Sequence, residues 1–259
     1  MSVYVITHKY LTDTINKLGY KYLYVGAYKQ KERRDGYCYD DVGDNISIKN
    51  NTYCELTGLY WMWKNCKDEY KGLVHYRRFF TSNSLSANIK YFLDEKKLQA
   101  KLQGYDILVG ERIYLSENSV YDDYAVYHYK KDIDNLIELI RRDFPEYSSA
   151  LDTVLKKNYY NPTNIFYCKS TVMDDYCEWL FEVLTRFERI TDISEYNVQQ
   201  ARIFGFVAER LLNVWIEKNK LKQREVLVIQ TDSRFRLRVR KKLDRIFKKS
   251  LTKKQKYEK

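Results

Sequence analysis

The chain has 259 residues, 44% apolar and 16% aromatic, which is enough for one α/β core with appendages. Its five cysteines show neither a C-x-x-C pair nor zinc-ligand spacing, which argues against a disulfide framework and a zinc protein. It has no secretory leader and no apolar run of about 20 residues, so we expect a soluble intracellular protein rather than a membrane-spanning one.

The formal net charge of +11 is concentrated at one end of the chain. Residues 234–259 contain thirteen Lys or Arg and two acids, so residues 1–233 sum to zero. We therefore expect a neutral domain over 1–233 and a basic tail over 234–259. A neutral body without a recognition module argues against nucleic acid as the partner.

The predicted elements of the N-terminal half alternate between strands and helices. We expect strands over Val3–Thr7 and Tyr20–Gly26 with a helix-compatible segment between them, as in a parallel sheet. Turn residues at 40–51 precede an amphipathic helix over 52–65. A buried strand over Gly72–Tyr76 follows.

The C-terminal half adds longer helices. We expect strands over Tyr105–Val109, after Asn161 and over Glu225–Ile229, and helices over Asp132–Asp143, Met173–Ile190 and Val198–Lys218. No G-x-G-x-x-G or P-loop follows the first strand, which argues against a dinucleotide or NTPase fold of the usual kind. The pattern predicts one α/β domain before the tail.

Cationic side chains follow the predicted strand GLVHYRRFF (residues 72–80). In parallel α/β sheets, ligands bind outside the carboxyl ends of strands. The residues at such ends are Thr7, His8, His75, Tyr76, Arg77 and Arg78. Paired arginines bind phosphate oxygens, so we expect an anionic ligand here. The alternative is that both arginines form structural ion pairs with the acids of residues 40–44.

Acidic residues give two further signals. Glu55 lies near the start of the helix predicted over 52–65, beside apolar residues, where an unpaired acid is costly. It either caps the helix or serves a site. The one Asp-x-Asp motif, Asp132–Asp134, lies at a predicted helix start, where the helix dipole already explains acids. We therefore predict no metal site there.

Several runs of the sequence together resemble a known family: DNIS, YCELTGLYWMWKN, GLVHYRR, NIF, YCEWLF and RIFGFVAERLL. The chain resembles, over roughly residues 2–230, a bacterial glycosyltransferase family long filed as a domain of unknown function, found among capsular and exopolysaccharide biosynthesis enzymes. The resemblance implies a glycosyltransferase A-like fold with a mixed, mostly parallel central sheet flanked by helices. It also implies a nucleotide-sugar donor and, for some relatives, galactofuranosyl transfer from UDP-galactofuranose.

A looser likeness to other sugar transferases implies roles for two positions. Glu55 takes the place of the acid that binds the donor sugar, and His75 to Arg77 take the place of a metal-binding Asp-x-Asp pair. We therefore expect cations, with His75 adding to the effect if it is protonated, to stabilise the departing UDP. This predicts transfer without a metal or other cofactor, with Mg²⁺ or Mn²⁺ as the alternative.

Inverting transfer also needs a carboxylate base. Glu209 is one candidate, and Asp44, Asp174 and Glu178 are alternatives; a structural pairing of Glu209 with Arg210 or Arg202 is the other interpretation. The expected donor-binding residues are Thr7, His8, Asp44, Asn45, Asn50, Tyr53, Glu55 and Tyr76, and the expected acceptor-binding residues are Asn164, Trp179 and Arg202.

The tail has apolar residues at helical spacing among its cations: Phe235, Val239, Leu243, Ile246 and Phe247. A basic amphipathic helix of this kind lies on anionic membrane. We expect a peripheral protein on the inner face of the plasma membrane that moves galactofuranose or galactose from a UDP-sugar to a lipid-linked glycan in capsular, exopolysaccharide or O-antigen biosynthesis. The alternatives are a nucleic-acid-binding protein that uses the tail and a non-catalytic scaffold of a polysaccharide assembly complex.

Overall fold

Alternating side chains on the first strand, β1 (Ser2–Thr7), divide the core into two layers. The computed structural model describes residues 2–11, 17–240, 242–245 and 248. Tyr4 and Ile6 belong to one apolar cluster and Val3 and Val5 to the other. Because successive side chains of a strand point to opposite faces of a sheet, β1 is buried on both sides.

Among the residues that the structure describes, the central sheet has nine strands and is mixed. Its main path runs β10-β6-β9-β4-β1-β2-β3, and β5 links β4 to β11 beside this path. β1 pairs in parallel with β2 and β4, as do β2 with β3 and β6 with β10, whereas β9 is antiparallel to β4 and β6. The other strands are β2 (Lys21–Tyr24), β3 (Tyr37–Tyr39), β4 (Tyr70–His75), β5 (Arg78–Phe80), β6 (Ile107–Gly110), β9 (Phe166–Lys169), β10 (Gln223–Val226) and β11 (Val228–Gln230), with β7 (Ile113–Tyr114) and β8 (Tyr159–Tyr160) forming a separate pair.

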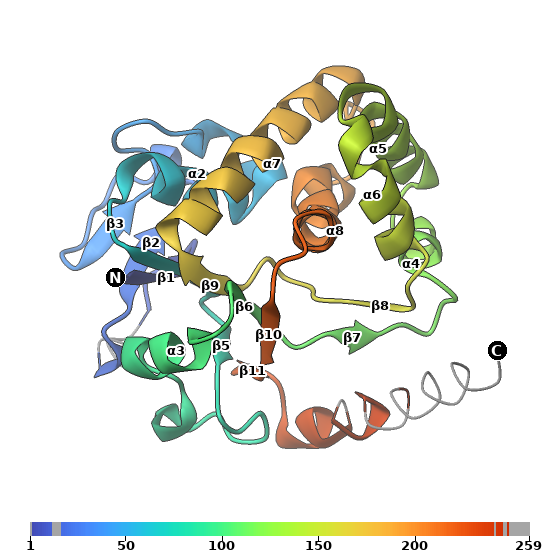
Figure 1. The fold of residues 1–259 in the computed structure, drawn as a ribbon. Coiled ribbons are helices and arrows are strands. Elements are labelled where there is room, and N and C mark those ends of the chain that lie inside the picture. Colours follow the sequence, from blue (N-terminus) through green and yellow to red (C-terminus); the bar gives the residue numbers. More distant parts are fainter. Residues whose placement is uncertain (1, 12–16, 241, 246–247, 249–259) are drawn as a thin grey trace.

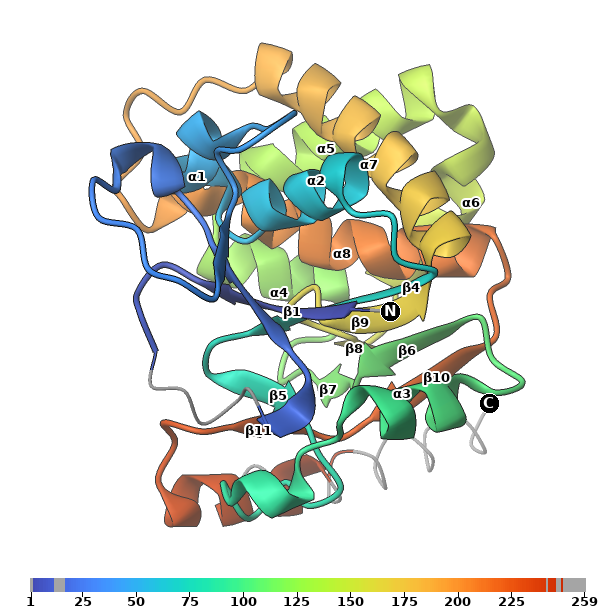
Figure 2. The ribbon, with the colours of Figure 1, turned by 90° about the vertical axis from the view of Figure 1, so that its left-hand side faces the viewer.

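Helices cover the two faces of the sheet unequally (Figures 1 and 2). One face carries α1 (Asn50–Tyr53), α2 (Leu56–Asn65), α4 (Val120–Tyr127), α5 (Lys130–Asp143), α6 (Ser148–Leu155), α7 (Ser170–Ile190) and α8 (Ile203–Lys218). The other face carries α3 (Glu95–Leu102), and the helical residues 235–240 and 242–245 lie on the same side. Within the described part of the chain, no helix has the length and apolar character needed to span a membrane.

The expected α/β architecture is confirmed, and two elements differ from the sequence prediction. The helix expected over 52–65 is broken at Cys54, whose φ of 53° is left-handed. The strand expected over 225–229 is divided between β10, which pairs with β6, and β11, which pairs with β5. Part of the segment expected to be helical between the first two strands, residues 12–16, lies outside the described residues, as does part of the tail.

A buried carboxylate joins the end of β2 to α2. Asp40 is 0% exposed and accepts four hydrogen bonds. Its donors are the backbone N–H groups of Gly26 (2.9 Å) and Ala27 (3.0 Å) and the hydroxyls of Ser47 (2.5 Å) and Thr57 (2.6 Å). These bonds replace water around the charge and fix the loop at the carboxyl end of β2.

Replacing Asp40 with alanine should therefore destabilise the fold. The substitution leaves four donors without their acceptor, and we expect the free energy of unfolding to fall by roughly 3 kcal/mol or more. Urea unfolding followed by circular dichroism measures this loss. Asp41→Ala is the matched control, because Asp41 pairs with the half-exposed Arg33 and its loss should cost about 1 kcal/mol or less. Equal losses for the two variants would contradict the assignment.

Candidate active site

The loop before β9 meets the end of β4. The imidazole Nε2 of His75 lies 2.7 Å from the carbonyl oxygen of Thr163, a distance at which a protonated Nε2 donates to that oxygen. Thr163 and Asn164 both have left-handed backbones, with φ of 75° and 49°. Left-handed non-glycine residues are uncommon, and strained backbone of this kind clusters at functional sites.

Asparagine side chains hold this loop in place. The Asn161 side chain is buried and its Nδ2 donates to the carbonyl oxygen of Gly110 at the end of β6 (2.7 Å). Its backbone exchanges two hydrogen bonds of 2.9 Å with the side chain of Asn213 on α8. The loop is therefore tied to a strand and a helix that are far away in sequence.

Glu55 points toward the same loop. It occupies the N-terminal position of α2 but makes no side-chain capping hydrogen bond there. Instead its Oε1 accepts from Nδ2 of Asn164 (2.9 Å), which is 1% exposed. The Oδ1 atom of Asn164 is buried and has no hydrogen-bond partner among the described residues. Of the two roles expected for Glu55, the cap is wrong, and its carboxylate faces a polar site.

The second carboxylate of the site is Glu209 on α8. Burial raises its pKa, Arg210 opposes this shift, and the nearby charge of Glu55 raises the pKa further. The backbone N–H of Thr163 donates to it. The side chain is 21% exposed. Two carboxylates from different helices therefore meet at one loop.

The neighbouring Arg210 has a structural role. Its Nη2 lies 2.9 Å from Oδ2 of Asp123 on α4 in a buried ion pair, whereas its Nη1 lies 3.4 Å from Oε2 of Glu209. The expected structural pairing of Glu209 with Arg210 is thus present as a longer contact. No ion pair joins Glu209 to Arg202 among the described residues; Arg202 Nε donates to Sγ of Cys54 at 3.1 Å.

The two arginines after β4 have different environments. Arg77 forms an ion pair of 2.8 Å with Asp232, and both side chains are about 40% exposed. Arg78 on β5 has no hydrogen bond or ion pair to its guanidinium in the described part of the chain. The alternative that these arginines pair with the acids of residues 40–44 is therefore wrong. Arg78 retains an uncompensated charge beside the site.

Histidines at the strand ends favour the neutral form. Burial lowers the pKa of His75, Glu55 opposes this, and Arg78 lowers it further. Burial and neighbouring cations also lower the pKa of His8, whose ring contacts the Tyr76 ring edge-on at 5.0 Å. Thr7 is buried, and its hydroxyl donates to the carbonyl oxygen of Lys9 (2.6 Å). These directions favour a neutral His75, so the added cationic effect of a protonated His75 is not supported.

Other expected site residues make contacts elsewhere. Tyr53 donates to Glu188 and stacks on Phe204, and Trp179 stacks on Tyr147, so both pack in the helical layer. Asp44 accepts from Tyr60, Asn45 bonds Gly43 and Ser47, and Asn50 bonds Cys54 and Thr57. Of the alternative bases, Asp174 pairs with Lys71, and Glu178 is exposed on α7. In the Asp-x-Asp motif, Asp132 accepts from Tyr196, and Asp134 pairs with Lys130. Their roles in binding or catalysis stay predictions.

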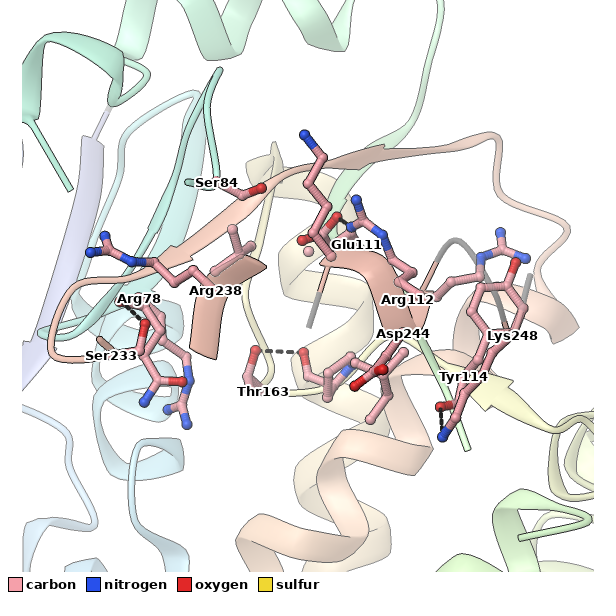
Figure 3. A pocket seen from close by; sticks show the side chains of 17 residues that line it. Arg78, Ser84, Glu111, Arg112, Tyr114, Thr163, Ser233, Arg238, Asp244 and Lys248 are labelled. Atoms are coloured by element: carbon pink, nitrogen blue, oxygen red, sulfur yellow. Dashed lines mark hydrogen bonds and ion pairs between the residues drawn. The ribbon is translucent and has the colours of Figure 1, made fainter. Parts of the chain in front are cut away.

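A cavity of about 520 Å³ adjoins this cluster (Figure 3). Arg78 and Thr163 belong to its wall, together with residues of β6, β7, β11 and the C-terminal helix. In the described ranges, no three His, Cys, Asp or Glu side chains are grouped so as to hold a metal ion. Sequence reasoning missed Thr163; the only signal for it was its place in the turn sequence NPTN.

Comparison with solved structures defines the class of protein. The apo structure of WbbM, a bifunctional glycosyltransferase, superposes on this chain with a TM-score of 0.80 and 31% sequence identity. The likeness covers 90% of this chain and 45% of that one, so this chain spans about half the length of the solved protein. Fold and site together define a glycosyltransferase-like α/β domain.

The family follows from the sequence itself. Residues 2–220 match the family described as "Domain of unknown function (DUF4422)", and the chain belongs to that family. The match ends before the basic tail, as the sequence resemblance predicted. No curated protein matches the chain.

The stabilities of two variants distinguish the structural role of Arg210 from the partly exposed position of Glu209. Arg210→Leu should lower the free energy of unfolding by about 3–5 kcal/mol, because it leaves Asp123 as an unpaired buried charge. Glu209→Gln, one residue away on the same helix, should change it by about 1 kcal/mol or less. Denaturant unfolding of both variants tests this, and a loss for Glu209→Gln as large as that for Arg210→Leu would contradict it.

Proposed function

We propose that this chain is a glycosyltransferase that moves galactofuranose or galactose from a UDP-sugar to a lipid-linked glycan acceptor. The observation that carries the proposal is the meeting of Glu55, His75, Asn164 and Glu209 at one loop beside the unpaired Arg78. The likeness to a bifunctional glycosyltransferase supports the reaction class. The family resemblance supports a place in capsular, exopolysaccharide or O-antigen biosynthesis.

Departure of UDP is the step that needs positive charge. Negative charge builds on the phosphate oxygen as the glycosidic bond breaks, and a guanidinium near that oxygen lowers the barrier at any physiological pH. Arg78 forms no ion pair in the described part of the chain, although its charge also acts on Glu209, whereas Arg77 is paired with Asp232. We infer that Arg78 has the larger effect and that transfer proceeds without a metal.

The two carboxylates, Glu209 and Glu55, have different roles in the proposed reaction. Glu209 accepts the proton of the acceptor hydroxyl, since its raised pKa places it closer to neutral pH than an ordinary glutamate. Glu55 and Asn164 hold the donor sugar: the free Oε2 of the acid and the unpaired Oδ1 of the amide both accept from sugar hydroxyls. His75 donates to Thr163 and positions the loop.

The C-terminal helix supports action at a membrane surface. Phe235, Leu237 and Leu243 are 59%, 48% and 61% exposed on it. Exposed apolar residues among cations are typical of a helix that lies in the interface of an anionic bilayer. We propose that the protein works on the inner face of the plasma membrane, where lipid-linked acceptors are found.

Arg78→Ala should reduce transfer at least about 100-fold, because it removes the main charge that stabilises the leaving diphosphate. Arg77→Ala should cost less, since Arg77 is already paired. UDP released from UDP-galactose or UDP-galactofuranose in the presence of acceptor measures the rate. The matched control is Arg141→Ala on α5, which breaks a surface pair with Asp152 on α6. It should leave the rate unchanged.

EDTA should leave most of the activity of the wild-type enzyme intact in the same assay. The prediction of metal independence fails if EDTA abolishes transfer and added Mn²⁺ or Mg²⁺ restores it. The glycosyltransferase proposal itself fails if no UDP-sugar in a panel yields UDP or a glycosylated product.

The pH dependence of transfer should report Glu209. A base acts as the carboxylate, so activity is full above its pKa and falls as pH drops through it; burial should place this fall above the ordinary range of glutamate. Glu209→Asp should keep an acid limb at a shifted pH, whereas Glu209→Gln should lose about 10²–10⁴-fold. kcat/KM measured from acidic to neutral pH tests this, and an unchanged profile for Glu209→Gln would exclude Glu209 as the base.

A further inference from the structure

The cavity beside the site is lined mainly by cations. Its wall contains Arg78, Arg112, Arg238, Lys242, Arg245 and Lys248, against two carboxylates, Glu111 and Asp244. Both carboxylates already have partners: Glu111 pairs with Arg245, and Asp244 with Arg240 at 3.9 Å. An excess of positive charge therefore faces the cavity.

Two arginines of the wall carry this excess most clearly. The Nε and Nη1 atoms of Arg238 are buried and have no hydrogen-bond partner among the described residues. Arg78 likewise has no partner to its guanidinium there. Buried guanidinium groups are normally hydrogen-bonded, because desolvation of an unpaired charge is costly. In Figure 3, Arg78 and Arg238 lie on the same side of the cavity, to the left of Arg112.

The C-terminal helix supplies its cations from one face. Arg238, Lys242, Arg245 and Lys248 recur at intervals of three or four residues, which is the spacing of one helical face. Lys248 donates to Ser116 Oγ (2.9 Å) and Tyr114 O (3.4 Å), so this face is fixed against the loop around β7. The apolar residues Phe235, Leu237 and Leu243 are exposed. The same helical segment thus contributes cations to the cavity wall and carries exposed apolar side chains.

We propose that this cavity binds the diphosphate group of the lipid-linked acceptor, with Arg238 and Lys242 as its main ligands. The inference rests on the proposed function and adds the location and chemistry of the acceptor's anionic group. Guanidinium and ammonium groups bind diphosphate oxygens through charge-assisted hydrogen bonds. A lipid whose headgroup enters from under a membrane-lying helix meets this cavity first, and its sugar then lies toward Arg78 and Thr163, which belong to both cavity and site.

Both the acceptor lipid and the UDP-sugar contain a diphosphate group, and binding experiments distinguish the two ligands. Isothermal titration of the full chain with geranyl diphosphate, with UDP and with geraniol compares the three ligands directly. The double variant Arg238→Ala/Lys242→Ala should weaken binding of geranyl diphosphate at least tenfold. It should leave the Kd for UDP within about twofold, and geraniol should not compete.

The matched control also removes two positive charges from the C-terminal segment, but at positions outside the cavity. Arg234→Ala/Arg236→Ala changes two exposed residues that do not line the cavity, and it should leave the binding of both diphosphates unchanged. Equal weakening by the control, weakening of UDP alone, or no weakening of geranyl diphosphate overturns the inference. Failure of the wild-type chain to bind UDP overturns the proposed function instead, so the two failures are distinguishable.

Discussion

The short loop at 161–164 is the constraint on which the site depends. Asn161 fixes it to β6 and α8, and from there Thr163 accepts from His75 while Asn164 donates to Glu55. Each bond joins the loop to a different element, so β4, α2, β6 and α8 are held in one arrangement. Two consecutive left-handed non-glycine residues, Thr163 and Asn164, carry the two groups that make these contacts.

The electrostatic interactions of the site follow from the position of this loop. The loop brings the carboxylates of Glu55 and Glu209 near one another, and the charge of Glu55 raises the pKa of Glu209. Arg210 limits this effect at Glu209, but its shorter ion pair is with Asp123, so Glu209 keeps a raised pKa. In the proposed reaction, Glu209 is the base and Arg78, at the start of β5, is the cation that acts on the leaving diphosphate.

Sequence periodicity predicted the fold better than the site. The short runs of apolar residues in β1 and β4 are local patterns. They predict these strands correctly because both strands are buried on both faces. The meeting of Glu55 with Asn164 across 109 residues has no local pattern. Sequence reasoning named both positions, but it placed Glu55 with the donor and Asn164 with the acceptor and did not predict their contact. The left-handed backbone at Cys54, which separates α1 from α2 just before Glu55, has no sequence signal either, since cysteine rarely adopts it.

The tail shows why charge alone does not define its role. As sequence, residues 234–259 are an excess of cations on a neutral body; the sequence favoured a membrane helix, with nucleic-acid binding as an alternative. In the described part of the helix, Arg238 and Arg245 line the cavity, while Phe235, Leu237 and Leu243 are exposed. A helix used only for nucleic acid would have no reason to bury Arg238 Nε and Nη1, whereas the proposed transfer to a lipid-linked acceptor uses both the buried cation and the exposed apolar side chains.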